Sequence, residues 1–187
     1  GLIRTFDSSA DEVFFDVAQF AWRRELEAHW REIRAELDTL LLARDRIPTF
    51  QEVSPEQHVV SNDERWRTFF FQVFGVAIDA NCKRCPRTAE LLSRVPGVGN
   101  AMFSILLPGK HIPEHRGPYK GLLRYHLALR IPSPAESCWI EVAGQREGDD
   151  LGLGRDARTV EAWHLVQHRV ERVREPGRVG GEHDVVD

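Results

Sequence analysis

The chain has 187 residues, of which 42% are hydrophobic and 29% are charged, a composition typical of one soluble globular domain. Its net charge of −4 argues against nucleic acid as the main partner, because phosphate binding favours a basic surface. No apolar run approaches the roughly 18 residues that a membrane helix needs, and no signal peptide is recognisable. We therefore expect no integral membrane segment and a cytoplasmic location.

The first predicted element is a helix in the N-terminal quarter of the chain. Its apolar residues recur at alternating spacings of four and three, which draws one stripe along a helix: Leu26, Trp30, Ile33, Leu37 and Leu40. Charges of both signs cover the other positions, whereas a membrane-surface helix would carry an excess of Lys and Arg. The pattern predicts a helix that packs on the rest of a domain.

From residue 65 onward the sequence predicts strands with one short helix. The aromatic run at 65–75 is typical of a strand, and the segment that follows predicts a short helix with Thr88 in the cap position. Three further strands are predicted at residues 100–109, 122–132 and 138–145. This order of elements favours a sandwich or barrel over a parallel α/β sheet.

Three cysteines, Cys82, Cys85 and Cys138, are too few for a secreted disulfide framework and odd in number. Cys82 and Cys85 have the CxxC spacing that also occurs in zinc and redox sites. A structural zinc site needs four ligands, and the sequence contains no second pair of this kind. We interpret these cysteines as reduced, incidental thiols.

The sequence changes character after Gln145, where convincing strand patterns stop. Residues 160–173 predict an amphipathic helix, and residues 174–187 have the composition of a disordered tail. We therefore divide the chain into residues 1–145, which hold the N-terminal helices and the β domain, and an atypical tail of residues 146–187.

The segment HIPEHRGPYKGLLRYH, residues 111–126, carries the side chains best suited to binding chemistry. His115 lies in a predicted turn between two strands, where an imidazole can be directed outward as a metal ligand. Arg124 and His126 are two residues apart on a predicted strand and therefore share one face. If that face points inward, a guanidinium beside an imidazole favours a bound carboxylate. An exposed strand face explains the same pattern equally well.

The longer segment FSILLPGKHIPEHRGPYKGLLRYHLALRIP, Phe103 to Pro132, resembles the core signature of the aspartyl/asparaginyl β-hydroxylase family. That signature runs Ser, Pro-Gly, Pro-x-His-x-Gly-Pro, Leu-Arg-x-His-Leu-x-Leu and Ile-Pro, and the chain matches it without a gap. The similarity covers residues 11–145. The family consists of non-haem Fe(II), 2-oxoglutarate-dependent dioxygenases. The resemblance implies an α+β chain, mainly β, with a double-stranded β-helix (jelly-roll, cupin-like) core after N-terminal helices.

Carried over residue by residue, the resemblance implies that His115 is the first iron ligand. Three residues would help to hold 2-oxoglutarate: Ser104, Arg124 and His126. Many dioxygenases have a carboxylate ligand two residues after the first histidine, where this chain has Gly117. Its absence fits the family, because iron with a dianionic cosubstrate is already close to neutral. We interpret His111 as structural.

The implied reaction is hydroxylation of the β-carbon of an aspartyl or asparaginyl residue or of a related substrate. The partner would be a peptide, an amino acid or a lipid acyl chain, and the lack of a membrane segment weakens the lipid option. The alternative is a catalytically inactive jelly-roll binding domain that lacks the second iron ligand. A cupin-like metal enzyme without 2-oxoglutarate is a third class, and it would be indifferent to the loss of Arg124.

The tail departs from the family where the second iron-ligating histidine should lie. His164 falls near the expected distance, but the flanking motif is missing and the local pattern is helical. When degenerate codons for Leu151 to Thr159 are translated one base later, they permit Trp-Val-Leu-Asp-Glu-Thr-His-Glu, which resembles that motif. We therefore hypothesise that the reading frame slips near Gln145, so that the closing strands of the jelly roll are missing.

Overall fold

The computed structural model describes residues 14–57, 60–115, 122–131, 133, 138–147 and 162–169, and only the backbone course of residues 162–169. The helices are α1 (Arg23–Ala28), α2 (Trp30–Leu41), α3 (Phe50–Val53), α4 (Asp79–Arg84) and α5 (Pro86–Ser93). The strands are β1 (Trp66–Val73), β2 (Val76–Ala77), β3 (Val98–Leu106), β4 (Leu122–Arg130), β5 (Ile140–Val142), β6 (Gln145–Glu147) and β7 (Ala162–Arg169). Short 3-10 turns lie at Val17–Gln19, Arg44–Arg46 and Pro55–Gln57.

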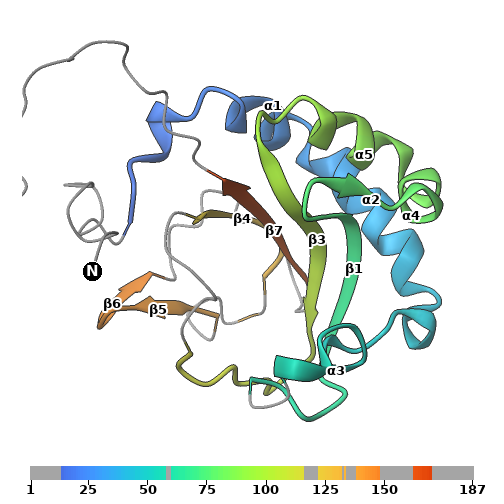
Figure 1. Cartoon of the computed structure of the whole chain (residues 1–187), viewed down its shortest axis with the longest axis vertical. Coiled ribbons are helices and arrows are strands. Elements are labelled where there is room, and N and C mark those ends of the chain that lie inside the picture. The colour runs from blue at the N-terminus through green and yellow to red at the C-terminus, as the bar shows by residue number, and fades with distance from the viewer. Residues whose placement is uncertain are drawn as a thin grey trace, which may run out of the picture.

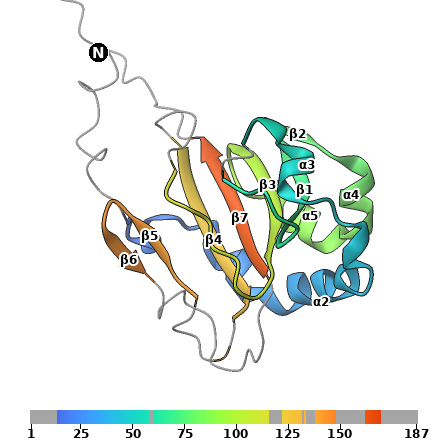
Figure 2. The ribbon, with the colours of Figure 1, turned by 90° about the horizontal axis from the view of Figure 1, so that it is seen from below.

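Five of the strands form one antiparallel sheet with the order β2-β1-β3-β7-β4. Helices α2, α4 and α5 lie on one side of this sheet, and the β5-β6 hairpin lies away from it on the other side (Figures 1 and 2). The chain is therefore α+β with antiparallel strands, as expected. The jelly-roll arrangement stays a prediction, because the described residues form one large sheet and a separate hairpin.

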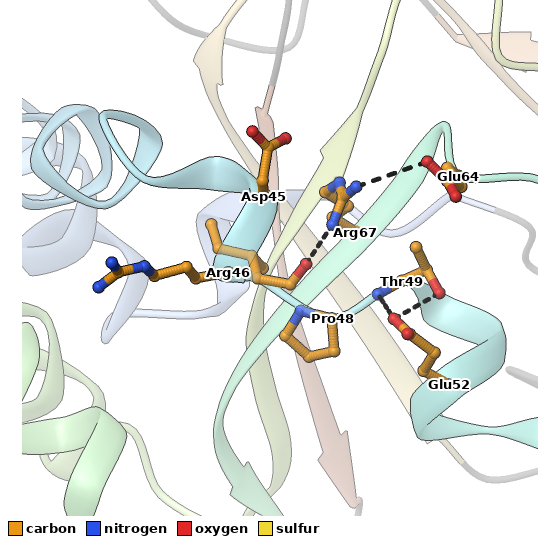
Figure 3. Close-up of a pocket in the computed structure, with 8 residues that line it drawn as sticks. Asp45, Arg46, Pro48, Thr49, Glu52, Glu64 and Arg67 are labelled. Carbon is orange, nitrogen blue, oxygen red and sulfur yellow. Dashed lines mark hydrogen bonds and ion pairs between the residues drawn. The ribbon is translucent and has the colours of Figure 1, made fainter.

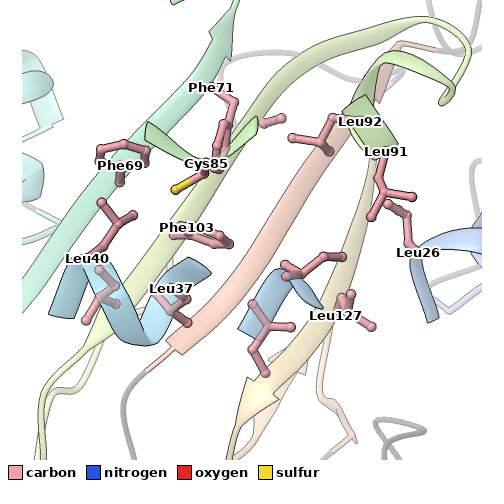
Figure 4. Close-up of a cluster of buried hydrophobic side chains, with 14 of the residues drawn as sticks. Leu26, Leu37, Leu40, Phe69, Phe71, Cys85, Leu91, Leu92, Phe103 and Leu127 are labelled. Carbon is pink, nitrogen blue, oxygen red and sulfur yellow. The ribbon is translucent and has the colours of Figure 1, made fainter. Parts of the chain in front are cut away.

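The core lies between the helices and the sheet (Figure 4). The helices contribute the apolar stripe predicted from the sequence, of which Leu26, Ile33, Leu37 and Leu40 are buried and Trp30 is partly buried. The sheet contributes alternate residues of its strands: Phe69, Phe71, Phe103, Ile105, Leu127 and Leu129. Each such side chain contributes about 1.5–3 kcal/mol when removed from water. The one predicted helix is interrupted at His29, which separates α1 from α2.

Helix α5 begins at Pro86 without a side-chain cap of its own. Its first amides are satisfied from α2 instead, because the Glu36 carboxylate accepts hydrogen bonds from Arg87 N at 2.8 Å and Thr88 N at 2.8 Å. The Thr88 hydroxyl donates to the same carboxylate at 2.6 Å. Thr88 is thus the third residue of the helix, and its predicted role as the cap was wrong.

Two other expectations need correction. The predicted strand 138–145 is a hairpin, because Ala143 and Gly144 have φ of 50° and 78° and turn the chain between β5 and β6. The predicted helix at 160–173 is wrong over residues 162–169, which form β7. Pairing with β3 on one side and β4 on the other supplies backbone partners that local helical periodicity does not reveal. The rest of that segment and residues 174–187 lie outside the described residues.

Candidate active site

The three residues predicted to bind the cosubstrate lie on one face of the sheet. Successive side chains of a strand point to opposite faces. The core residue Phe103 precedes Ser104 on β3, and the core residue Leu127 follows His126 on β4. Ser104, His126 and Arg124 therefore share the face opposite the helices. The spacing in the sequence predicted the shared face of Arg124 and His126, and Ser104 lies on the same face of the sheet with β7 between its strand and theirs.

The Ser104 hydroxyl has a fixed donor in the interior of the protein. The indole Nε1 of Trp66 donates a hydrogen bond to Ser104 Oγ at 2.9 Å, and Ser104 is 7% exposed. The Trp66 ring stacks on Phe50 at 3.7 Å between centroids. Because an indole N–H can only donate, the serine oxygen is the acceptor and keeps its own hydrogen for another partner. The Ser104 hydroxyl can therefore donate a hydrogen bond to a bound anion.

Thr68 is a second hydroxyl on this face. It pairs with Ser104 across β1 and β3 and is fully buried. Within the part of the chain that the structure describes, its Oγ1 has no hydrogen-bond partner. A buried hydroxyl normally has one, so a bound polar group or a water would complete it. Sequence analysis missed both Trp66 and Thr68, although their alternation in the aromatic strand places them on the face of Ser104.

Arg124 and His126 differ in charge at neutral pH: the guanidinium is positive and the imidazole is neutral. Burial and the neighbouring positive charge of Arg124 lower the pKa of His126 to about 4, so its imidazole is neutral. Desolvation also lowers the pKa of Arg124, although solvent still reaches the side chain. Arg124 stays protonated even so, because its ordinary pKa is above 12. The pair thus presents one positive charge beside a neutral ring, which suits a carboxylate.

His115 lies in the loop after β3 and is exposed. Its Nδ1 is 2.9 Å from the backbone oxygen of Pro113. A carbonyl oxygen only accepts, so this hydrogen bond requires the proton on Nδ1 and leaves the Nε2 lone pair available. Metal-binding histidines commonly have this arrangement, with the second nitrogen donating to a backbone carbonyl. His111 is exposed in the same loop.

The sequence profile of the family described as aspartyl/asparaginyl beta-hydroxylase matches residues 27–152, which include all four of these site residues. The chain belongs to this family. A Rhizobium tropici ornithine lipid ester-linked acyl 2-hydroxylase is 45% identical over 154 residues, which cover 80% of this chain and 54% of that protein. The human aspartyl/asparaginyl beta-hydroxylase is 32% identical over 127 residues, 65% of this chain and 16% of that protein.

A third relative is the human aspartate beta-hydroxylase domain-containing protein 2. It is 34% identical over 132 residues, which cover 62% of this chain and 34% of that protein. The chain therefore spans about half the length of the Rhizobium relative and less of the two human ones. Strand β7 lies beyond the residues that the family profile matches.

His115 is the described residue that the family resemblance predicts as a metal ligand. No group of three or more His, Cys, Asp or Glu side chains gathers within the described part of the chain. The register pairs the backbone of His164 with Phe103 and Leu127, which are core residues. The backbone of position 164 is thus in register with residues of the helix-covered face, and the position opposite Ser104 is 163.

The CxxC cysteines lie on the helix side of the sheet. Burial, then the charge of Glu36, raises the pKa of Cys85 to about 12. Burial, then the charge of Asp79, also raises the pKa of Cys82, whose thiol donates to Phe71 O at 3.5 Å. Both groups are therefore held as thiols, the form that is a poor nucleophile and metal ligand.

A cavity of about 520 Å³ lies beside the start of β1 and the segment that precedes α3 (Figure 3). Its lining consists of Asp45, Arg46, Ile47, Pro48, Thr49, Glu52, Glu64 and Arg67. Several polar groups there already bind one another: Arg67 Nη1 donates to Ile47 O at 2.6 Å, and Glu52 accepts from Thr49 N at 2.6 Å. Its lining includes none of Ser104, His115, Arg124 and His126, so the cavity is separate from the candidate active site.

Along the part of the chain with a described structure, no helix is both long and apolar enough to cross a membrane.

Proposed function

We propose that the chain is an Fe(II)- and 2-oxoglutarate-dependent hydroxylase. The observation that carries the proposal is the shared face of Ser104, Arg124 and His126. A hydroxyl donor, a positive charge and a neutral imidazole share this face, on strands that are separated by β7. Charge-assisted hydrogen bonds of this kind are the strongest that a protein makes to a carboxylate.

Each residue has a distinct task in this proposal. Arg124 supplies the charge that attracts a carboxylate of 2-oxoglutarate, and Ser104 donates its hydroxyl hydrogen to it. Trp66 keeps the Ser104 oxygen in place through the hydrogen bond at 2.9 Å. His126 stays neutral, so it offers a hydrogen bond without adding a second positive charge.

His115 would hold the iron through Nε2, since Nδ1 is occupied by Pro113 O. When bound, iron and 2-oxoglutarate supply the oxidising chemistry: O₂ and 2-oxoglutarate convert a C–H bond into C–OH and yield succinate and CO₂. This proposal needs two histidine ligands, and the described residues supply a candidate for the first, His115. A chain without that second ligand would be the inactive binding domain.

For the substrate we propose a lipid acyl chain, hydroxylated at the carbon next to the carbonyl. Support comes from the Rhizobium relative, whose name specifies an ester-linked acyl 2-hydroxylase and which matches 80% of the chain at 45% identity. An aspartyl or asparaginyl residue is the second candidate, favoured by the human aspartyl/asparaginyl beta-hydroxylase at 32% identity. Both substrates place the reacting carbon near a carbonyl group.

The test is turnover with defined components. The protein is incubated with Fe(II), 2-oxoglutarate and O₂, and succinate and hydroxylated product are measured for an ornithine lipid and for a peptide carrying Asp and Asn. We expect succinate and hydroxylated lipid from the unaltered chain, and neither from His115→Ala. Arg124→Gln should raise the KM for 2-oxoglutarate at least tenfold. Arg94→Gln is the matched control, because Arg94 ends α5 and forms ion pairs with Glu25 of α1 and Glu90 of α5.

Each alternative gives a different result. Hydroxylated peptide without hydroxylated lipid would select the second substrate. No turnover by the unaltered chain, with 2-oxoglutarate binding that His115→Ala leaves unchanged, would favour the inactive binding domain. Turnover that is indifferent to both 2-oxoglutarate and Arg124→Gln would contradict the cosubstrate assignment.

A further inference from the structure

The loop that carries His115 begins at a buried lysine. The side chain of Lys110 is 3% exposed, and its Nζ donates to Ser61 Oγ at 2.9 Å and to Asp63 Oδ1 at 3.1 Å. A buried ammonium group is costly unless it is paired and hydrogen-bonded. Both conditions are met here by one short segment, residues 61–63, which precedes β1. The contact therefore joins two parts of the chain that are far apart in sequence.

The backbone is held at the same place. Leu107 N donates to Arg65 O at 2.8 Å, and Lys110 N donates to Leu107 O at 3.0 Å, which closes a four-residue turn. Gly109, in this turn, has φ of +74°, the conformation that the third position of a type II turn requires. Residues 107–110 are thus fixed to residues 61–65 by backbone and side chain together.

Asp63 is held in a fixed orientation of its own. Its Oδ1 also accepts a hydrogen bond from Arg65 N at 2.9 Å. Partial burial alone would raise the pKa of Asp63, but the hydrogen bonds from Arg65 N and Lys110 outweigh it and lower the pKa. The carboxylate therefore stays charged opposite the ammonium group.

An apolar contact follows two residues later. Ile112 packs against the cluster formed by Phe50, Val60 and Trp66. Trp66 is also the donor to Ser104. The loop and the Ser104 hydroxyl are thus positioned by the same group of side chains, and the last anchored residue is three positions before His115.

We propose that Lys110, clamped by Ser61 and Asp63, is the positioning residue that sets the place of His115 as a metal ligand. This inference rests on the proposed function of His115. Removing the clamp would leave the loop held by Ile112 alone beyond the turn, so His115 would sample more positions. Groups that are hydrogen-bonded directly to a ligating histidine are typically worth a factor of about 10–100 in metal affinity, and we expect Lys110, which acts through the loop, at the lower end of this range.

The test compares Lys110→Met with Lys110→Arg in the full chain. Co(II) affinity is measured by titration, and amide hydrogen exchange is measured over residues 107–115. We expect Lys110→Met to weaken Co(II) binding at least tenfold and to speed exchange in this loop. Lys110→Arg, which keeps the charge facing Asp63, should recover most of both. Glu36→Ala is the control for lost stability, because its contacts lie between α2 and α5.

The outcomes are distinguishable. If Lys110→Met lowers the unfolding midpoint as Glu36→Ala does but leaves Co(II) affinity and loop exchange unchanged, the clamp has no positioning role. If the unaltered chain binds no Co(II) in a His115-dependent manner, the proposed function fails. The clamp is then judged by exchange alone, and unchanged exchange in Lys110→Met overturns it.

Discussion

The indole N–H of Trp66 donates to the hydroxyl of Ser104 across two neighbouring strands, at 2.9 Å and out of contact with solvent. The Trp66 ring is at the same time stacked on Phe50, with an interplanar angle of 7°. One side chain thus performs a packing role and a polar role. The first keeps α3 on the sheet, and the second determines where the serine hydrogen can point.

Trp66→Phe should separate these two roles. Phenylalanine keeps an aromatic ring against Phe50 but removes the donor, so we expect a loss of about 1 kcal/mol in the free energy of unfolding, plus a cost for the smaller ring. Binding of 2-oxoglutarate should weaken because Ser104 is no longer oriented. Denaturant unfolding and calorimetric titration measure the two effects. Unchanged affinity in Trp66→Phe, with reduced affinity in Ser104→Ala, would show that orientation by Trp66 is unnecessary.

His126 should make stability depend on pH in the acid range. Its folded pKa of about 4 is below the ordinary value of about 6.5, so the unfolded chain binds its proton more readily. The contribution to stability is full above about pH 6.5 and is lost as pH falls toward 4. Unfolding free energies from pH 7.5 to 4 should therefore show a slope that His126→Gln reduces.

The same experiment has a direct spectroscopic check. The ring resonances of His126 should titrate near pH 4, and Arg124→Gln should raise this midpoint because it removes the neighbouring positive charge. A midpoint near 6.5 in the unaltered protein would contradict the burial that the structure shows for this ring.

Glu36→Ala should lower the stability of the fold without changing the binding of 2-oxoglutarate. The carboxylate caps the first amides of α5 from α2, and loss of a helix cap typically costs about 0.5–2 kcal/mol. Glu36→Gln keeps one acceptor oxygen and should lose less. Thermal unfolding measures the change, and KM for 2-oxoglutarate should stay within twofold. A large change in KM would mean that the helix layer positions the site.

A slipped reading frame near Gln145 is our proposal for the unusual tail. The bases that encode Leu151 to Thr159, read one base later, should encode Trp-Val-Leu-Asp-Glu-Thr-His-Glu. A chain translated in that frame should bind Co(II) more tightly, because it gains a histidine in the family's motif. Determining the nucleotide sequence is sufficient as a test, and any other shifted translation disproves the idea.

Local patterns predicted most of the helix and strand content correctly. The spacing of Leu26, Ile33, Leu37 and Leu40 follows directly from a helix with one buried side, and that signal is contained in the segment itself. Strand β7 was missed for the opposite reason. Its backbone partners belong to β3 and β4, so its conformation depends on residues far away in the sequence.

The candidate site shows the same difference between residues that local sequence reveals and residues that it does not. Arg124 and His126 were placed on one face by their spacing alone, and Ser104, Arg124, His126 and His115 were named from a resemblance carried by contiguous residues. The hydrogen bonds that position these residues could not be predicted, because their partners come from other parts of the chain. Nothing near Lys110 in sequence indicates that Asp63 binds it, and nothing near Ser104 indicates that Trp66 does.

The position of β7 has a consequence for biosynthesis. Strands β3 and β4 both pair with β7, which is the last of the described strands to leave the ribosome. Until it emerges, β2, β1 and β3 form one piece and β4 another, each with an open edge that another chain could pair with. The domain therefore cannot complete its sheet during most of its own synthesis. A stop codon before residue 162 would release two unjoined halves of a sheet rather than a slightly shorter protein.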